Sequence, residues 1–389
     1  MGKFIAWQIK RWLVPALVIL GVMVMSLVII SATENLTYTT YHDPMSGLDY
    51  NYATSTSTFF MAAMLYGSLV SIVFPMFVFN YKFGIRRADF YKQLPFGANQ
   101  LRRIIFVMGL VIAIIGTSLA FLTSVGILLI RYLSFDKSSL GTTIDPYSGM
   151  STTTALYDFN YRYLLIAYLL LVLNVFATYS ISCVFVYHNV SVFESIIGVL
   201  LAQVTIGLLP FVISSQIMTI KGWADNAYYE PIYVTFSTIS PILGAYNLNA
   251  LFYGIESDIW KNLYWNISTY VALGTAGFIW IFLTKDRSAD VENEKGNPSI
   301  ITLIALNGGF LSVMLLANML ASFTIYLGII INLFIIATYF FVNVLYGRGF
   351  KLKMHQWIPM AVVVLIVIAD LIALAVTRTA YGVETYSIL

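Results

Sequence analysis

The sequence predicts an all-α polytopic membrane protein with about nine transmembrane helices. Hydrophobic residues make up 59% of the 389 residues, and charged residues make up only 10%. Soluble domains are usually about one-quarter charged, so this composition indicates an integral membrane protein. The apolar residues also gather into runs of roughly 20 residues, the length that crosses the hydrocarbon core as a helix. Because lipid cannot hydrogen-bond to the backbone, each run is expected to be helical.

Nine apolar runs have a suitable length. In order, the predicted spans cover residues 12–32, 58–81, 104–130, 163–187, 195–217, 263–284, 299–320, 323–346 and 357–376. The first run is longer than the apolar part of a signal peptide, so we expect it to remain as a span. A further or re-entrant segment near residues 239–253 would change the count and the side on which the chain ends.

Lysine and arginine are distributed unevenly between the two sides of these spans. If the N-terminus lies inside, the inside segments hold 15 of the 21 Lys and Arg residues, and the outside loop 33–57 holds none. Short cytoplasmic loops carry an excess of Lys and Arg, so the sequence predicts a cytoplasmic N-terminus. Three long loops, 33–57, 131–162 and 218–262, would then lie outside. There they form either a simple cover over the spans or an outer gate.

The loop between the second and third spans, residues 82–103, is the most informative segment of the sequence. It contains six Lys or Arg residues and one acid, Asp89. A short helix is expected here and should end at Pro95, because proline cannot continue a helix. Phe90 and Leu94 are four residues apart and share one face of this helix. Two interpretations are open: an ordinary positively charged loop, or a short helix that docks on a soluble partner.

The segment RRADFYKQLPFGANQLRR, which ends at Arg103, resembles the first cytoplasmic loop of bacterial type 2 ABC exporter permeases, the Gram-positive multispan group. The residues that carry this resemblance are Arg87, Asp89, Tyr91, Leu94 and Pro95, followed by Arg102 and Arg103 where the chain returns to the membrane. In that family the loop contains a coupling helix that sits in a cleft of the ATPase subunit. The resemblance therefore implies that the residues of this ATPase-coupling loop are Arg86, Arg87, Asp89, Phe90, Tyr91, Leu94 and Pro95.

The same resemblance implies a smaller second contact on the cytoplasmic side, in the turn 188–194 between the fourth and fifth spans. The candidate residues are Phe193 and Glu194. The alternative is a plain helix–helix turn in which Glu194 lies near a helix N-terminus, where a carboxylate is favoured.

A change in composition predicts how the chain is divided. Residues 285–296 are rich in charge, in contrast to the apolar runs on both sides. We interpret residues 1–287 as a six-span exporter-type permease unit, residues 288–298 as a charged cytoplasmic linker, and residues 299–389 as a three-span C-terminal unit.

The sequence contains no motif for catalysis of its own. It has no G-x-x-x-x-G-K-S/T phosphate-binding loop, no H-E-x-x-H and no G-x-S-x-G. The chain is therefore not expected to be an enzyme or to bind a cofactor, and ATP and Mg²⁺ would be bound by the partner subunit. Its three histidines fall in separate loops, so no metal site is expected. The single cysteine, Cys183, is expected to be a buried small apolar residue.

Asp370 is the main ionisable residue inside a predicted span. A carboxylate within the bilayer is costly and by default indicates a function. It is expected either to be protonated or to hydrogen-bond a polar residue on another helix, such as Asn332 or Asn343. A single acid without an evident partner does not by itself predict a proton relay.

Together, these features and the resemblance imply a membrane permease subunit of an ATP-driven ABC exporter in a bacterial cell membrane. Two ATPase subunits, and a second copy of the permease or a sister permease, would complete the complex. No nucleic acid is expected as a partner. The cargo would be hydrophobic or amphipathic: a peptide, an antibiotic or a lipid. The alternatives are an ion-coupled secondary transporter and a membrane scaffold or sensor without transport.

Overall fold

The computed structural model describes one α-helix for each predicted span. It covers residues 2–34, 37–43, 48–50, 58–83, 97–135, 141–144, 151–156, 161–189, 191–220, 256–283, 300–320, 325–347, 350 and 352–381. In these ranges the α-helices are α1 (Gly2–Thr33), α2 (Thr58–Val78), α4 (Ala98–Leu133), α5 (Tyr161–His188), α6 (Val192–Ile220), α9 (Glu256–Leu283), α10 (Ile300–Leu320), α11 (Ile325–Gly347) and α12 (Met354–Tyr381). A short 3₁₀ helix, η1 (Asn80–Phe83), follows α2.

Eight helices in the described ranges are long and apolar enough to cross a membrane. The remaining helix, α2, has a shorter fully described apolar stretch, Ala62–Val78. Its backbone nevertheless forms 21 helical residues. At 1.5 Å per residue these span about 30 Å, the thickness of the hydrocarbon core. The prediction of a multi-pass helical membrane protein is thus confirmed.

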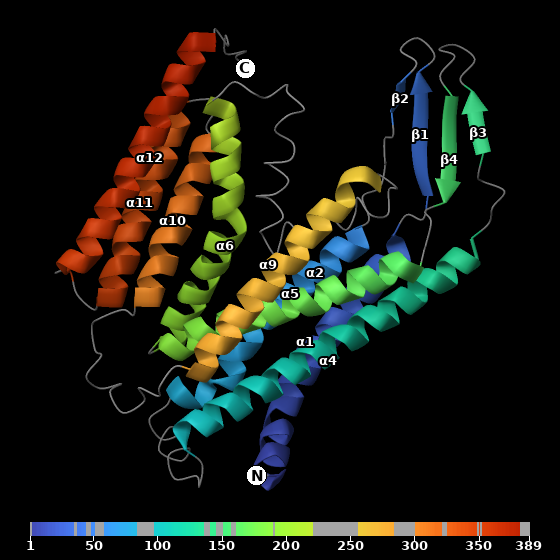
Figure 1. Cartoon of the computed structure of the whole chain (residues 1–389), viewed down its shortest axis with the longest axis horizontal. Helices are drawn as coiled ribbons and strands as arrows, with labels where there is room; N and C mark the ends of the chain where they lie inside the picture. The colour runs from blue at the N-terminus through green and yellow to red at the C-terminus, as the bar shows by residue number, and fades with distance from the viewer. Residues whose placement is uncertain are drawn as a thin grey trace.

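The helices alternate in direction, so their connections gather at two ends (Figure 1). One end contains the N-terminus, the start of α4 and the turn between α5 and α6. We call it the basic end, because Lys10, Arg11, Arg102 and Arg103 lie near it. The other end contains the close of α12 and the β-strands, and we call it the sheet end. This alternation agrees with the predicted order of the spans, and the side that faces the cytoplasm stays a prediction.

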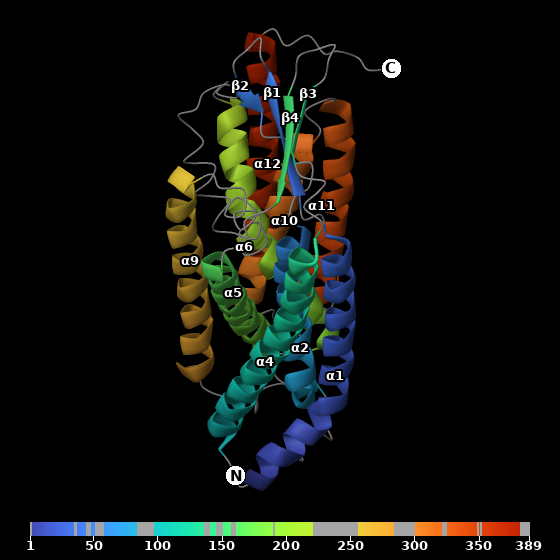
Figure 2. The same ribbon diagram turned by 90° about the vertical axis from the view of Figure 1, so that its right-hand side faces the viewer.

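The helices pack in two groups that lean against each other (Figures 1 and 2). Buried apolar side chains of α1, α2, α4, α5 and α9 form one large cluster. A second cluster joins α10, α11 and α12, and Ile197 and Leu201 of α6 pack against it. Helix α6 therefore packs with the C-terminal helices, and α9 returns to the N-terminal group. This packing cuts across the predicted division at residue 287; the linker 288–298 lies outside the described residues, so that boundary stays a prediction.

Small residues allow the closest helix contacts in both groups. A Cβ atom at Gly277 of α9 would lie 2.9 Å from the carbonyl carbon of Ser180 in α5. A Cβ atom at Gly309 of α10 would lie 2.7 Å from a side-chain carbon of Leu201 in α6. Within a membrane, such close approach is a main source of helix association because lipid tails are as apolar as the helix surfaces.

A small antiparallel sheet lies at the sheet end, beyond the ends of α1 and α4 (Figure 1). Its strands are β1 (Thr37–Asp43), β2 (Leu48–Tyr50), β3 (Gly141–Ile144) and β4 (Ser151–Leu156), in the order β2-β1-β4-β3. Strand β1 comes from the first predicted outside loop and β4 from the second, and Thr40 lies opposite Thr153. The all-α prediction is therefore wrong for these two loops. Both loops are rich in Thr and Tyr, which favour strands.

Arg131 brings the two loops of the sheet together. Its Nη1 donates hydrogen bonds to the backbone oxygens of Ser31 (2.6 Å) and Glu34 (2.9 Å). These bonds join the end of α4 to the end of α1, just before β1 begins. The helix ends are thereby fixed side by side, which places the following strands within pairing distance. Residues 221–255 of the third predicted outside loop, 218–262, lie outside the described residues, so the re-entrant segment near 239–253 stays a prediction.

Candidate functional site

The predicted ATPase-coupling residues occupy a loop that the structure describes only at its two flanks. Arg86, Arg87, Asp89, Phe90, Tyr91, Leu94 and Pro95 lie outside the described residues. The chain before the loop is η1, at the end of α2. The chain after the loop is the start of α4, which carries Arg102 and Arg103 in its second turn. The contacts of these two arginines therefore show what the loop is attached to.

Arg102 joins α4 to α5 at the basic end. Its side chain is only 1% exposed. Its Nη1 donates a hydrogen bond to the Tyr187 hydroxyl at 3.1 Å, and its guanidinium lies 4.9 Å from the centre of the Tyr187 ring. The Tyr187 ring also contacts Phe79, directly after α2. An aromatic face stabilises a desolvated guanidinium, so these rings allow a cation to be buried here.

Arg103 joins α4 to α9. Its Nη2 donates a hydrogen bond to the backbone oxygen of Phe282 at 2.7 Å, and its guanidinium lies 5.3 Å from the Phe282 ring. Helix α9 ends at Leu283, so this carbonyl is among the last four of the helix and has no intrahelical partner. A cation at a helix C-terminus is also favoured by the helix dipole. The start of α4 is thus bonded to both α5 and α9.

The turn between α5 and α6 is bonded to three other helices. Asn189 is buried and accepts a hydrogen bond from the Thr302 hydroxyl of α10 at 2.9 Å. The backbone oxygen of Glu194 accepts one from the Tyr346 hydroxyl of α11 at 2.7 Å. Nε2 of His188 accepts one from the indole N–H of Trp280 in α9 at 2.8 Å. The turn is therefore the point where the two packing groups meet.

These contacts form one continuous set, which we call the basic-end network. Its members are Arg102, Arg103, Tyr187, His188, Asn189, Glu194, Trp280, Phe282, Thr302 and Tyr346. The set links α4, α5, α6, α9, α10 and α11. A displacement at the start of α4, or at the turn, would be passed to both packing groups because packed helices move as rigid bodies.

The predicted second contact, Phe193 and Glu194, opens α6 within this network. The hydroxyl of Ser191 accepts a hydrogen bond from the Glu194 backbone N–H at 3.1 Å, so Ser191 caps the helix. Phe193 is 58% exposed, and its neighbour Val192 is 42% exposed. The turn therefore holds its backbone inward and directs an apolar pair outward. Sequence reasoning named Phe193 and Glu194 but missed their supports Asn189 and Ser191, although the S-x-x-E spacing was visible.

Asp370 lies in a different place, near the sheet end of the second packing group. Asn318 of α10 donates a hydrogen bond to its Oδ2 at 2.7 Å, and Gln216 of α6 donates another at 3.3 Å. Asn332 of α11 in turn donates to the Asn318 side-chain oxygen at 2.5 Å. We call Gln216, Asn318, Asn332 and Asp370 the Asp370 cluster.

The cluster corrects the partners expected from the sequence. Asn332 reaches Asp370 only through Asn318, and Asn343 donates to the backbone oxygen of Tyr339 in its own helix. Gln216 was missed, because its helix was assigned to the other half of the chain. The cluster and the basic-end network lie at opposite ends, so the structure does not bring Asp370 together with Phe193 and Glu194.

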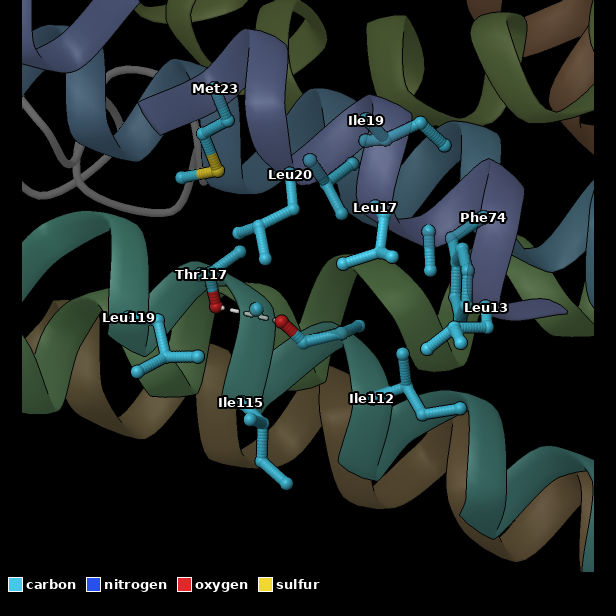
Figure 3. A pocket seen from close by; sticks show the side chains of 14 residues that line it. Leu13, Leu17, Ile19, Leu20, Met23, Phe74, Ile112, Ile115, Thr117 and Leu119 are labelled. Carbon is cyan, nitrogen blue, oxygen red and sulfur yellow. Dashed lines mark hydrogen bonds between the residues drawn. The ribbon is translucent and has the colours of Figure 1, made fainter. Parts of the chain in front are cut away.

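An apolar pocket of about 170 Å³ lies between α1, α2 and α4 (Figure 3). Leu17 and Leu20 of α1 point toward α4 across it, and Ile112 and Ile115 of α4 also belong to its lining. The polar group in its lining is the Thr117 hydroxyl, which donates to the backbone oxygen of Ala113 at 2.9 Å in its own helix. The pocket can therefore offer apolar contact to a hydrocarbon chain, but no hydrogen-bonding chemistry.

Within the described residues, no group of three or more His, Cys, Asp or Glu side chains could hold a metal ion. Cys183 is free and fully buried in α5, as predicted. No protein-family model, curated protein or solved structure matches this chain. Its function is therefore argued from its own residues and their geometry.

Proposed function

We propose that this chain is the membrane permease subunit of a type 2 ABC exporter. A separate pair of ATPase subunits would supply the energy, and a second copy or a sister permease would complete the transmembrane part. The proposal is supported by the resemblance carried by Arg87, Asp89, Tyr91, Leu94 and Pro95. It is also supported by the multi-pass helical architecture and by the absence of a phosphate-binding loop in the sequence.

The observation that carries the proposal is the attachment of α4 at the basic end. The loop that resembles a coupling helix runs directly into α4, where Arg102 is bonded to α5 and Arg103 to α9. A push on that loop therefore acts on three helices at once. An ordinary surface loop needs no such attachment, since its charged residues are satisfied by water.

The mechanism follows from this attachment. Nucleotide binding would draw the two ATPases together and move the loop as a short lever. The α5–α6 turn, with the exposed Phe193, would provide a second point of contact on the same face. Because the basic-end network joins the two packing groups, both groups would rock together and change the access of the cargo path. The cargo expected for such a path is hydrophobic or amphipathic.

Stimulated ATP hydrolysis in a reconstituted complex tests the proposal. The chain is purified with the ATPase encoded next to it and placed in liposomes. Asp89→Arg and Phe90→Ala are expected to abolish the stimulation of ATP hydrolysis while membrane insertion stays intact. Asp49→Arg, the same charge reversal in a predicted outside loop, is the matched control and should leave the stimulation unchanged. Stimulation that survives both loop variants, or a chain that recovers no ATP-binding subunit, would overturn the proposal.

An ion-coupled secondary transporter is a second candidate, favoured by Asp370 within a span. Buried carboxylates of this kind commonly mark ion pathways in membrane transporters. Transport into liposomes driven by a Na⁺ or proton gradient, without any ATPase, would support this candidate. The leading proposal expects no transport under those conditions.

A further inference from the structure

The Asp370 cluster has hydrogen-bond acceptors left over and no amide N–H to pair with them. Its three amide side chains are those of Gln216, Asn318 and Asn332, and each is at least 95% buried. Each amide nitrogen already donates two hydrogen bonds: one to a side-chain oxygen of the cluster and one to a backbone carbonyl. All of its amide N–H groups are therefore used.

The remaining groups are oxygens. Gln216 Oε1 and Asn332 Oδ1 are buried and have no hydrogen-bond partner within the described part of the chain. Each belongs to an amide whose nitrogen donates to another side chain of the cluster, Gln216 to Asp370 and Asn332 to Asn318, so each oxygen is one amide group away from the cluster's hydrogen bonds. A buried acceptor without a partner costs about 1–3 kcal/mol. Turning either amide over would direct its oxygen at another oxygen, so reorientation does not supply the missing donor.

The charge of the cluster also points to an electropositive ligand. Asp370 accepts both of its cluster bonds at Oδ2. Among the described residues it forms no ion pair with a Lys, Arg or His side chain. A carboxylate inside a span without a cation close by is costly. One carboxylate is balanced by one positive charge, so a monovalent ion fits the cluster and a divalent ion would leave an excess of charge.

We propose that the Asp370 cluster binds a sodium ion, with Asp370, Gln216 and Asn332 as its oxygen ligands. Hard cations prefer carboxylate and amide oxygens, and these three side chains come from α12, α6 and α11. A proton on Asp370 would supply a single donor, whereas a metal ion contacts several oxygens at once. The hydrogen bonds of the cluster, 2.5 to 3.3 Å long, keep its members close together and favour a small ion. The bound ion joins the helices of the second packing group near the sheet end, and this role does not depend on the proposed function.

Thermal unfolding of the purified full-length chain tests the site. NaCl replaces choline chloride at constant ionic strength and constant pH, and Tm is measured along the series. At a Na⁺ concentration tenfold above the dissociation constant, Tm is expected to rise by about 2 °C. LiCl and KCl are the matched comparisons, and K⁺ is expected to give a smaller rise. Equal Tm values in all four salts would overturn the proposal.

Variants locate the effect. Asp370→Asn is expected to abolish the Na⁺-dependent rise in Tm. Gln216→Leu is expected to increase about tenfold the Na⁺ concentration at which half of the rise in Tm is reached. Asn343→Leu, a buried amide outside the cluster, is the control and should keep the full rise. If Asp370→Asn does not fold, the salt series on the unaltered chain still decides. A rise that persists in Asp370→Asn, or a Tm that responds to acid pH but not to Na⁺, would contradict a sodium site; the latter would indicate proton binding.

Discussion

The basic-end network and the Asp370 cluster both hold a charged side chain between helices, but with different kinds of partner. Each joins helices that are far apart in the sequence, and each contains a charged side chain that is at least partly buried. At the basic end, Arg102 and Arg103 use aromatic faces and the carbonyl of Phe282 at the end of α9. In the Asp370 cluster, the carboxylate depends on amide side chains from two other helices.

The difference follows from where each set lies along its helices. Helix ends leave backbone carbonyls without partners, so an arginine there finds acceptors on any neighbouring helix that ends nearby. Inside a span every backbone N–H is already paired along the helix. An acid there must therefore find side-chain donors. The exposed Arg103 can leave its carbonyl and bond to it again at low cost, whereas Arg102 and the Asp370 cluster hold their helices through buried side chains.

Removing Arg102 should have the largest effect, because its partners are buried with it. Arg102→Ala is expected to lower the free energy of unfolding by about 3 kcal/mol, through loss of the cation–π contact and of the bond to Tyr187. Thermal unfolding in detergent measures this change. Arg11→Ala, an arginine on an exposed part of α1, is the control and should change Tm little. A loss of stability no larger than that of the control would mean that the basic end is not held through Arg102.

Removing the acid of the other set should have an intermediate effect. Asp370→Leu leaves the donors of Asn318 and Gln216 without their shared acceptor, so a loss of about 2 kcal/mol is expected. Hydrogen exchange should increase at the sheet-end turns of α10 and α11 and remain unchanged at the start of α4. Exchange that increases at both ends would show that the two sets are not independent.

Removing Arg103 should have the smallest effect on stability. Its side chain is exposed, and a cation at a helix C-terminus contributes about 0.3–1 kcal/mol. Arg103→Ala is therefore expected to change Tm only slightly, while amide exchange rises in the last turn of α9. Because the same residue attaches the proposed lever to α9, ATP stimulation should fall more than stability does. Parallel losses of both would indicate a purely structural role.

The helices could be predicted from the sequence, because an apolar run of about 20 residues is enough to indicate a membrane-spanning helix. Each of the nine predicted runs overlaps one described helix, although α1, α4 and α9 begin more than a turn before the predicted start. The sheet was missed, because strands β1 and β4 come from loops more than 100 residues apart, next to the helix ends that Arg131 joins. No local pattern in either loop reveals that pairing.

The basic loop could be predicted from the sequence, but the partners of Asp370 could not. The concentration of Lys and Arg in residues 82–103 is a property of composition, so it was visible in the sequence. The partners of Asp370 were not, because Gln216 and Asn318 reach it through helix rotation and through packing of α6 on α10. The packing of α6 with the C-terminal helices has a similar cause: a close contact at Gly309 of α10, which single-sequence patterns do not specify.

Photo-crosslinking from two positions tests the central claim most directly. A photoreactive residue is placed at Phe193, exposed at the basic end, or at Thr142, exposed in β3 of the sheet. After irradiation in native membranes, the captured proteins are probed for labelling by a photoreactive ATP analogue. The account predicts an ATP-binding partner joined to position 193 and none joined to position 142. An ATP-binding partner captured only at position 142, or at neither position, would contradict it.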